Sequence, residues 1–246
     1  MASHHLRFLP ALTALGLALS GCGGSNSDTS ANTDVGISGG LPAQAPAPSD
    51  FVDEIDNPWY PAPVGRVWRY VGQTADGTET NVVTVTARTR VVDGVTTRVV
   101  HDVVWLDGVL LEDTFDWIAE DTDGNVWYFG EQTKEYDGDQ VDTAGSWEAG
   151  VDGATAGIIM PADPATGDAY RQEYLEGEAE DQAKVQAIDA TATVPYGAET
   201  GLVQTLDFTR LEPDADEQKY YARGIGLVLS NALHQKDRSE LVAMTG

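Results

Sequence analysis

Asp102, Asp113 and Lys134 are the residues of this chain whose types and spacing could support chemistry. If the Asp-Gly pairs at 107–108 and 123–124 form two-residue turns, antiparallel pairing places the three side chains in one row across three strands. Directly opposed side chains lie about 5 Å apart at Cβ. Two carboxylates at that distance push one pKa upward, and a lysine lowers the pKa of its neighbour. The row therefore predicts a polar ligand-binding site, with carboxylate-based hydrolysis as the alternative. Three-residue loops with a bulge would instead shift the pairing by one residue and scatter the row.

The same pairing gathers apolar side chains on the face that carries the row. That face is predicted to hold Val83, Val85, Ala87, Val100, Val104, Leu106, Val109, Leu111, Phe115 and Trp117. Trp117 completes the predicted ligand-binding set, because aromatic side chains commonly line ligand clefts. His101 falls on the opposite face beside acidic residues, where it is a weaker acid–base candidate without a nucleophile.

The densest acidic cluster surrounds Glu176, Glu178 and Glu180. In a strand these three glutamates would share one face and could bind calcium, which prefers oxygen ligands. The alternative is a solvated surface loop, since like charges repel unless a cation is bound. A zinc site is disfavoured, because only His101 and His234 follow the N-terminal segment. We expect no cofactor other than this candidate calcium.

Turn signals dominate the rest of the chain. Six Asp-Gly pairs, at 76–77, 93–94, 107–108, 123–124, 137–138 and 152–153, interrupt alternating segments rich in Val, Thr, Trp and Tyr. Further strands are expected over 169–175, 182–194, 201–211, 217–223 and 226–233. The pattern predicts a single all-β domain, an antiparallel meander curled into a barrel or half-barrel, with a β-sandwich as the alternative.

Cys22 ends the run Leu19-Ser20-Gly21-Cys22 after an apolar stretch, which is typical of a lipoprotein signal. We expect residues 1–21 to be a signal peptide, Cys22 to carry a lipid, 22–50 to form a flexible tether, and 51–246 to form the domain. The protein is accordingly predicted to be exported and anchored by lipid to the cell membrane or the outer membrane.

The formal net charge of −26 excludes some classes of partner. Such a charge repels nucleic-acid phosphates and anionic lipid headgroups, so we expect no nucleic-acid partner. It favours cationic partners or metal ions, or it keeps the surface soluble.

Three segments carry a resemblance to known proteins. They are Asp56-Asn57-Pro58-Trp59-Tyr60-Pro61, the segment from Asp123 to Glu131, and Tyr220-Tyr221-Ala222-Arg223-Gly224-Ile225-Gly226-Leu227-Val228. Together they resemble uncharacterised bacterial secreted lipoproteins, and the last is similar to the closing hairpin of TapB-like or LolA-like curled sheets. The resemblance implies a curled antiparallel sheet and supplies no catalytic residues.

These observations favour a lipid-anchored, non-catalytic binding module for an apolar or amphiphilic ligand, or for an envelope partner protein. A carboxylate-based hydrolase and a calcium-binding structural protein are the alternatives.

Overall fold

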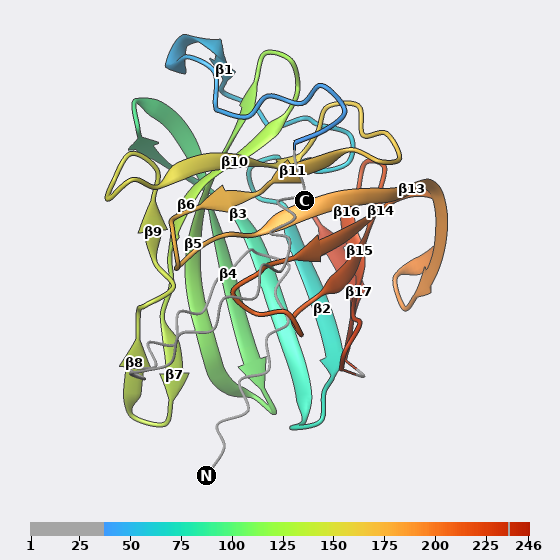
Figure 1. Cartoon of the computed structure of the whole chain (residues 1–246). Coiled ribbons are helices and arrows are strands. Elements are labelled where there is room, and N and C mark those ends of the chain that lie inside the picture. The colour runs from blue at the N-terminus through green and yellow to red at the C-terminus, as the bar shows by residue number, and fades with distance from the viewer. Residues whose placement is uncertain (1–36, 236) are drawn as a thin grey trace, which may run out of the picture.

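The computed structural model describes residues 37–235 and 237–246, and nearly all regular structure in this part is antiparallel strand (Figure 1). One short 3-10 turn, η1 (Pro48–Asp50), precedes the strands. The strands are β1 (Phe51–Val52), β2 (Val67–Gln73), β3 (Thr78–Val92), β4 (Val95–Leu106), β5 (Val109–Asp121), β6 (Val126–Gln132), β7 (Glu135–Asp137), β8 (Gln140–Asp142), β9 (Trp147–Glu148), β10 (Thr155–Met160), β11 (Ala169–Arg171), β12 (Glu173–Tyr174), β13 (Gln182–Val194), β14 (Gly197–Phe208), β15 (Glu217–Ala222), β16 (Gly226–Ala232) and β17 (Arg238–Thr245).

The strands form one sheet that curls until it is nearly closed into a barrel. From β2 the order runs through β3, β4, β5 and β6 on one side, and through β17, β16, β15, β14 and β13 on the other. Short strands form the seam, because β10 pairs with both β6 and β12, and β11 pairs with β13. The predicted all-β fold with a curled antiparallel meander is confirmed, and the sheet does not split into a sandwich.

The Asp-Gly turns at 93–94 and 107–108 close the β3–β4 and β4–β5 hairpins as expected. Their aspartates have φ values of 47° and 49°, and both glycines have φ of 82°. Positive φ at both central residues matches the right-handed twist of the strands, and the residues flanking each turn pair directly. The sequence pattern thus fixes where these strands begin and end.

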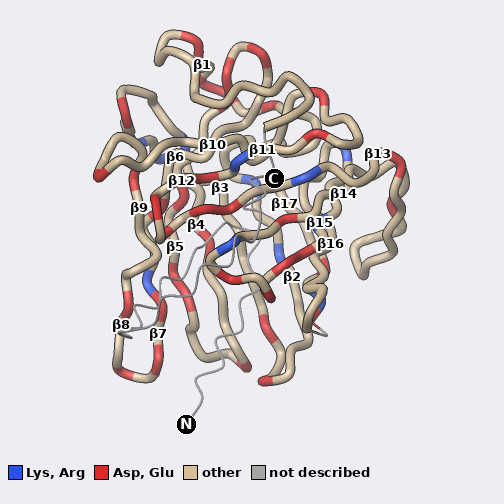
Figure 2. Tube along the Cα trace, in the orientation of Figure 1, with Lys and Arg blue, Asp and Glu red and all other residues tan. Residues whose placement is uncertain are grey.

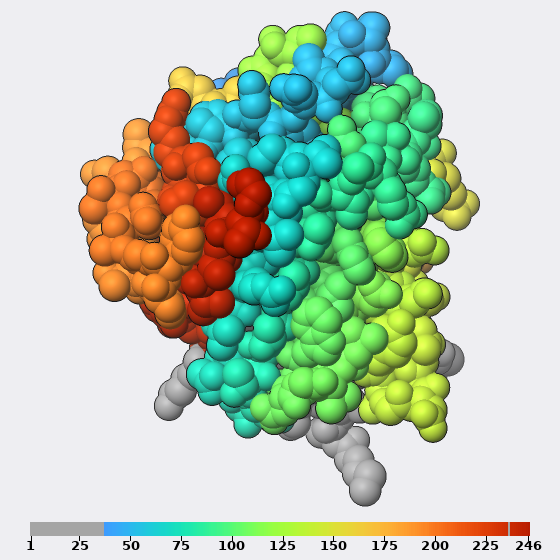
Figure 3. All heavy atoms as spheres, turned by 180° about the vertical axis from the view of Figure 1, so that it is seen from behind, coloured from blue at the N-terminus to red at the C-terminus, as the bar shows by residue number. Residues whose placement is uncertain are grey.

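Three of the five later strands follow the sequence pattern closely, whereas the strand expected over 169–175 is split into β11 and β12, and the one expected over 201–211 is β14, at 197–208. The strand expected over 182–194 is β13 with the same bounds, and β15 and β16 differ from expectation by one residue at their ends. β17 was not expected. Figure 3 shows the β13–β14 hairpin, in orange, beside the red strand β17, where the Tyr196 amide donates a 3.0 Å hydrogen bond to the Leu241 carbonyl.

Part of the expected tether contacts the barrel. The amide of Ser38 donates to the Ala169 carbonyl at 3.0 Å, and the Ser38 hydroxyl donates to the Gly167 carbonyl at 3.0 Å. Leu41 and Ala45 pack against the core. The ordered domain therefore begins before residue 51. Within the described ranges, no helix has the length and apolar character needed to cross a membrane.

Candidate functional site

Buried carboxylates are the main feature of the barrel interior. Buried and more exposed side chains alternate along much of β3, β4 and β5, so every second residue there points into the lumen. Figure 2 shows that acidic positions recur over the strands whereas basic positions are few. We call the following buried or nearly buried side chains the lumen acids: Glu79, Asp102, Glu112, Asp116, Glu131, Glu173, Asp207 and Glu217. An ionised carboxylate is costly to bury alone, so these groups must hold protons, pair with a cation or bind a ligand.

Asp102 and Asp113 point to opposite faces of the sheet. An extra residue of β5, Leu111, shifts the β4–β5 pairing, and Asp102 consequently lies opposite Thr114. This β-bulge reverses the face of the sheet to which the β5 side chains after Leu111 point. The prediction that both aspartates share one row is therefore wrong. Asp113 does pair with Lys134, through backbone hydrogen bonds of 3.0 and 3.1 Å in the two directions. The two residues lie on the outer face, without Asp102.

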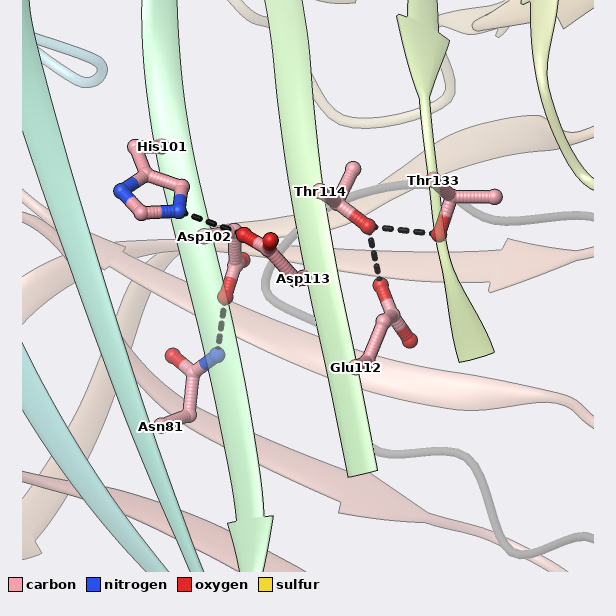
Figure 4. A network of polar contacts seen from close by, with 7 residues as sticks. All are labelled: Asn81, His101, Asp102, Glu112, Asp113, Thr114 and Thr133. Atoms are coloured by element: carbon pink, nitrogen blue, oxygen red, sulfur yellow. Dashed lines mark hydrogen bonds and ion pairs between the residues drawn. The ribbon is translucent and has the colours of Figure 1, made fainter. Parts of the chain in front are cut away.

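The outer face carries a contact between His101 and Asp113 (Figure 4). Nε2 of His101 lies 2.6 Å from Oδ1 of Asp113, and the two side chains are 34% and 28% exposed. The Phe115 ring stacks on the imidazole with 4.4 Å between centroids. Trp117 follows on the same face, with the Arg90 guanidinium 4.0 Å above its ring. The prediction that Trp117 faces the lumen is therefore wrong, for the same reason as for Asp113.

One carboxylate oxygen of Asp102 accepts a hydrogen bond in the lumen, and the other has no hydrogen-bond partner among the described residues. The side chain is 1% exposed, and Oδ1 accepts a hydrogen bond from the amide of Asn81 (Figure 4). Its other oxygen, Oδ2, has no hydrogen-bond partner among the described residues. Burial raises the pKa of Asp102 well above its ordinary value, and the charges of Asp116 and Glu112 raise it further against the opposing Asn81 hydrogen bond. A cation near Oδ2 would favour the ionised form.

Tyr128 joins two further lumen acids. Its hydroxyl lies 2.8 Å from Oδ1 of Asp116 and 2.7 Å from Oε2 of Glu131. The hydroxyl has one hydrogen to donate, so the second contact requires a protonated carboxyl that donates to the Tyr128 oxygen. Burial raises the pKa of Asp116 to about 7 and, with the charge of Asp116, raises the pKa of Glu131 well above its usual value. This trio therefore holds a proton near neutral pH.

Lys219 supplies a buried cation on the other side of the lumen. Its Nζ lies 3.1 Å from Oδ2 of Asp207 and 3.6 Å from Oε2 of Glu217. Burial lowers the pKa of Lys219, but the charges of Asp207 and Glu217 outweigh burial and raise it. Lys219 is the one buried basic side chain in the described part of the chain. The lumen thus already binds one ammonium group, its own, through two carboxylates.

A pocket of about 40 Å³ lies beside Asp102. Asp102 and Asp116 line it together with the aromatic side chains of Tyr60, Trp68 and Tyr70. Apolar contacts from Pro61, Val83, Val100, Gly226 and Leu227 complete its wall. Hydrogen bonds to carbonyl oxygens of the 225–227 segment, at 2.7 and 3.0 Å, fix the Trp68 indole and the Tyr70 hydroxyl. This space holds about three water molecules, or an ammonium headgroup, but not an acyl chain.

The loop that brings Tyr60 to the pocket is organised by Asn57. The Asn57 side-chain oxygen accepts hydrogen bonds from the amides of Trp59 and Tyr60 at 2.8 and 3.1 Å. Its side-chain nitrogen donates to the carbonyls of Gly124 and Pro161. The buried Glu120 carboxylate accepts the Asn57 amide at 2.8 Å. The segment singled out by resemblance is thus a cap held on the barrel by hydrogen bonds.

Glu176, Glu178 and Glu180 do not share a strand face. Residues 176–178 form a tight turn between Leu175 and Ala179, in which φ of the central glycine is 75°. Glu176 and Glu178 are exposed, and the Glu180 carboxylate accepts the Gly177 amide at 2.9 Å. The described ranges contain no group of three or more His, Cys, Asp or Glu side chains arranged to hold a metal ion.

Sequence reasoning missed Tyr60, Tyr70 and Asp116 as members of the pocket beside Asp102, and Lys219 as the buried cation of the same lumen. These residues come from a loop and from strands that meet only when the sheet curls. One signal was available for Asp116, which lies between two aromatic residues in Phe115-Asp116-Trp117. A carboxylate inside such an apolar strand segment usually has a specific partner.

Comparisons with known proteins give no role for this chain. No protein-family model matches it, and no curated protein matches it. One solved structure is similar, that of a candidate lipoprotein from Parabacteroides distasonis ATCC 8503, with 11% identity and a TM-score of 0.43. The match covers 76% of this chain and 98% of that one. Neither TapB-like nor LolA-like proteins are among these matches.

Proposed function

We propose that this chain is a non-catalytic binding module of the cell envelope, whose lumen pocket binds an ammonium group. The free Oδ2 of Asp102, buried beside Tyr60, Trp68 and Tyr70, carries the proposal. An ionised carboxylate attracts a cation strongly where water is excluded, and aromatic rings attract cations through their negative faces. Lys219 provides a precedent within the same lumen, because its ammonium contacts two carboxylates.

The size and lining of the pocket narrow the ligand class. A purely apolar ligand would leave Oδ2 of Asp102 without a partner and would need more than about 40 Å³. A small amine fits, and so does the amino headgroup of an amphiphile whose tail stays outside the pocket. A partner protein would have to insert a lysine side chain. We therefore propose an amine-bearing small molecule or amphiphile.

Attachment to the envelope rests on Cys22, which lies outside the described residues. The run Leu19-Ser20-Gly21-Cys22 after an apolar stretch supports lipidation and export. Metabolic labelling with a radioactive fatty acid should label the wild-type chain, and Cys22→Ser should abolish both the label and membrane fractionation. A labelled Cys22→Ser variant would exclude this anchor.

Carboxylate-based hydrolysis is not proposed, because it depended on adjacent Asp102 and Asp113 side chains and these point to opposite faces. Calcium binding near 176–180 stays a prediction that calorimetry with calcium can address.

The binding proposal is tested with methylammonium chloride, a minimal ammonium ligand, and methanol, its neutral analogue. The purified protein is titrated at pH 8 and constant ionic strength, with potassium chloride as the salt control. We expect methylammonium alone to raise the melting temperature, with saturation in the millimolar range. Equal shifts from methanol or potassium chloride, or no shift at all, would overturn the proposal.

A further inference from the structure

A second cavity, of about 290 Å³, lies between the segment after β1 and the end of the β3–β4 hairpin. Its lining includes the apolar residues Val52, Ile55 and Ile118 and the polar residues Thr89, Thr96 and Arg98. It shares no lining residue with the pocket beside Asp102. Its volume is close to the lower end of the range for small-molecule sites, about 300–1,000 Å³. The cavity is therefore a separate candidate site.

Arg98 is the cationic group of this cavity, and it has no ion pair with any described residue. Other arginines of the same hairpin are engaged. Arg90 contacts the Glu148 carboxylate at 2.6 Å, and Arg88 lies 5.1 Å from the centroid of the Phe115 ring. Neither Arg90 nor Arg88 lines the cavity, so Arg98 is the one basic side chain among its lining residues.

The two contacts of the Arg98 guanidinium are long, and most of its N–H donors make no hydrogen bond to the described residues. Nη1 donates to the Ala87 carbonyl at 3.4 Å and Nη2 to the Asp53 carbonyl at 3.5 Å, both at the long limit of a hydrogen bond. A guanidinium carries five N–H donors in a planar fork that matches a carboxylate or a phosphate. The half-buried Arg98 therefore offers an unfilled anion-binding group at the cavity.

We infer that this cavity binds a small organic monocarboxylate, with its carboxylate on Arg98 and its apolar body against Val52, Ile55 and Ile118. Asp53 also lines the cavity, and the chain as a whole is strongly acidic. Repulsion by these charges disfavours a doubly charged phosphate more than a singly charged carboxylate. The apolar wall favours a body of several methylene groups over a purely polar ion.

Hexanoate is the probe, with hexanamide as its neutral analogue and inorganic phosphate as the competing anion. Calorimetric titration of the purified protein should show hexanoate binding to wild type, and binding at least tenfold weaker to Arg98→Gln. Arg88→Gln removes a positive charge from the same hairpin outside the cavity and should bind as wild type does. Hexanamide should bind at least tenfold more weakly than hexanoate.

NMR of labelled isoleucine methyl groups tests the same inference without any substitution. Hexanoate should shift the Ile55 and Ile118 signals and leave that of the exposed Ile188 unchanged. Unweakened binding to a folded Arg98→Gln, tighter binding of phosphate than of hexanoate, or unshifted Ile55 and Ile118 signals would each overturn the inference. These outcomes are independent of ammonium binding beside Asp102.

Discussion

The side-chain amide of Asn81 donates a hydrogen bond to Oδ1 of Asp102 across strands β3 and β4, while Oδ2 of the same carboxylate has no partner among the described residues. This asymmetry fixes the orientation of the carboxylate and leaves one oxygen available at the aromatic pocket. A buried acceptor without a partner costs free energy, and a bound ammonium group would recover it.

Asp102→Asn should abolish ammonium binding without harming the fold. The substituted amide keeps an oxygen for Asn81 but removes the negative charge that attracts the ligand. We expect methylammonium to bind at least tenfold more weakly, and the melting temperature of the free protein to stay equal or rise, because a buried carboxylate has been removed. Thermal-shift titration measures both quantities.

Asp113→Asn is the matched control for that substitution. Asp113 lies on the outer face of the neighbouring strand and contacts His101, so its charge is remote from the pocket. Binding of methylammonium should be unchanged. Equal weakening by the two substitutions would indicate a general effect of net charge, which contradicts a site at Asp102.

The free protein should lose stability as the pH rises from about 4 to about 8. Burial is the main cause that raises the pKa of Glu79 to about 8 and those of Asp116 and Glu217 to about 7 in the folded state. Because the unfolded chain releases these protons near pH 4, the folded state binds more protons over this window. Stability from these groups is complete below pH 4 and is lost as pH rises through the folded pKa values.

Urea unfolding at pH 5, 6, 7 and 8 measures this slope. Glu79→Gln should flatten it between pH 5 and 8, whereas Glu178→Gln, at an exposed turn position, should leave it unchanged. A stability that increases steadily from pH 5 to 8 would contradict the prediction.

Lys219→Met should destabilise the protein strongly at pH 8. The substitution leaves Asp207 and Glu217 in the lumen without their cation, and breaking a buried pair in this way costs about 3–5 kcal/mol. The loss should be smaller at pH 5, where Glu217, whose pKa is raised by burial to about 7, is protonated. Urea unfolding of Lys219→Met beside Lys184→Met, an exposed lysine on β13, checks the expectation. Similar losses for both lysines would argue against a buried ion pair.

The strands of this fold could be predicted because their signals are local. Asp-Gly pairs fix tight turns with positive φ, and alternation of Val and Thr fixes the segments between them. The bounds of β13 and the turns at 93–94 and 107–108 follow from these signals alone. Local signals therefore determine the hairpins.

The composition of the site could not be predicted in the same way. The bulge at Leu111 lies within an apolar strand segment, without a glycine to mark it, and it reverses the faces of Asp113 and Trp117. Lys219 and Asp207, from β15 and β14, face the same lumen as Asp116 of β5 only after the sheet closes through β10. Closure depends on contacts between segments far apart in sequence, which a pattern of turns does not specify.

Gly130 lies at a second β-bulge, between β5 and β6, and we expect that no larger residue can replace it without loss of stability. The β5–β6 pairing shifts between Asp116 and Ile118, next to Gly130, whose φ is 126°. A Cβ at this position would lie 2.3 Å from the Trp147 carbonyl oxygen, so backbone atoms would have to move. Since this shift keeps Tyr128 and Glu131 together in the lumen, Gly130→Ala should cost several kcal/mol of stability and weaken ammonium binding.

Gly108→Ala provides the comparison for Gly130→Ala. Gly108 also has positive φ, 82°, but a Cβ there meets no atom within 4 Å, so only the backbone conformation is strained. That strain costs about 1–2 kcal/mol, and it lies in a turn remote from Tyr128. Urea unfolding should rank the two variants accordingly, with ammonium binding kept in Gly108→Ala. If Gly130→Ala were as stable as Gly108→Ala, the close approach of β9 to β6 could not be what holds this part of the lumen in register.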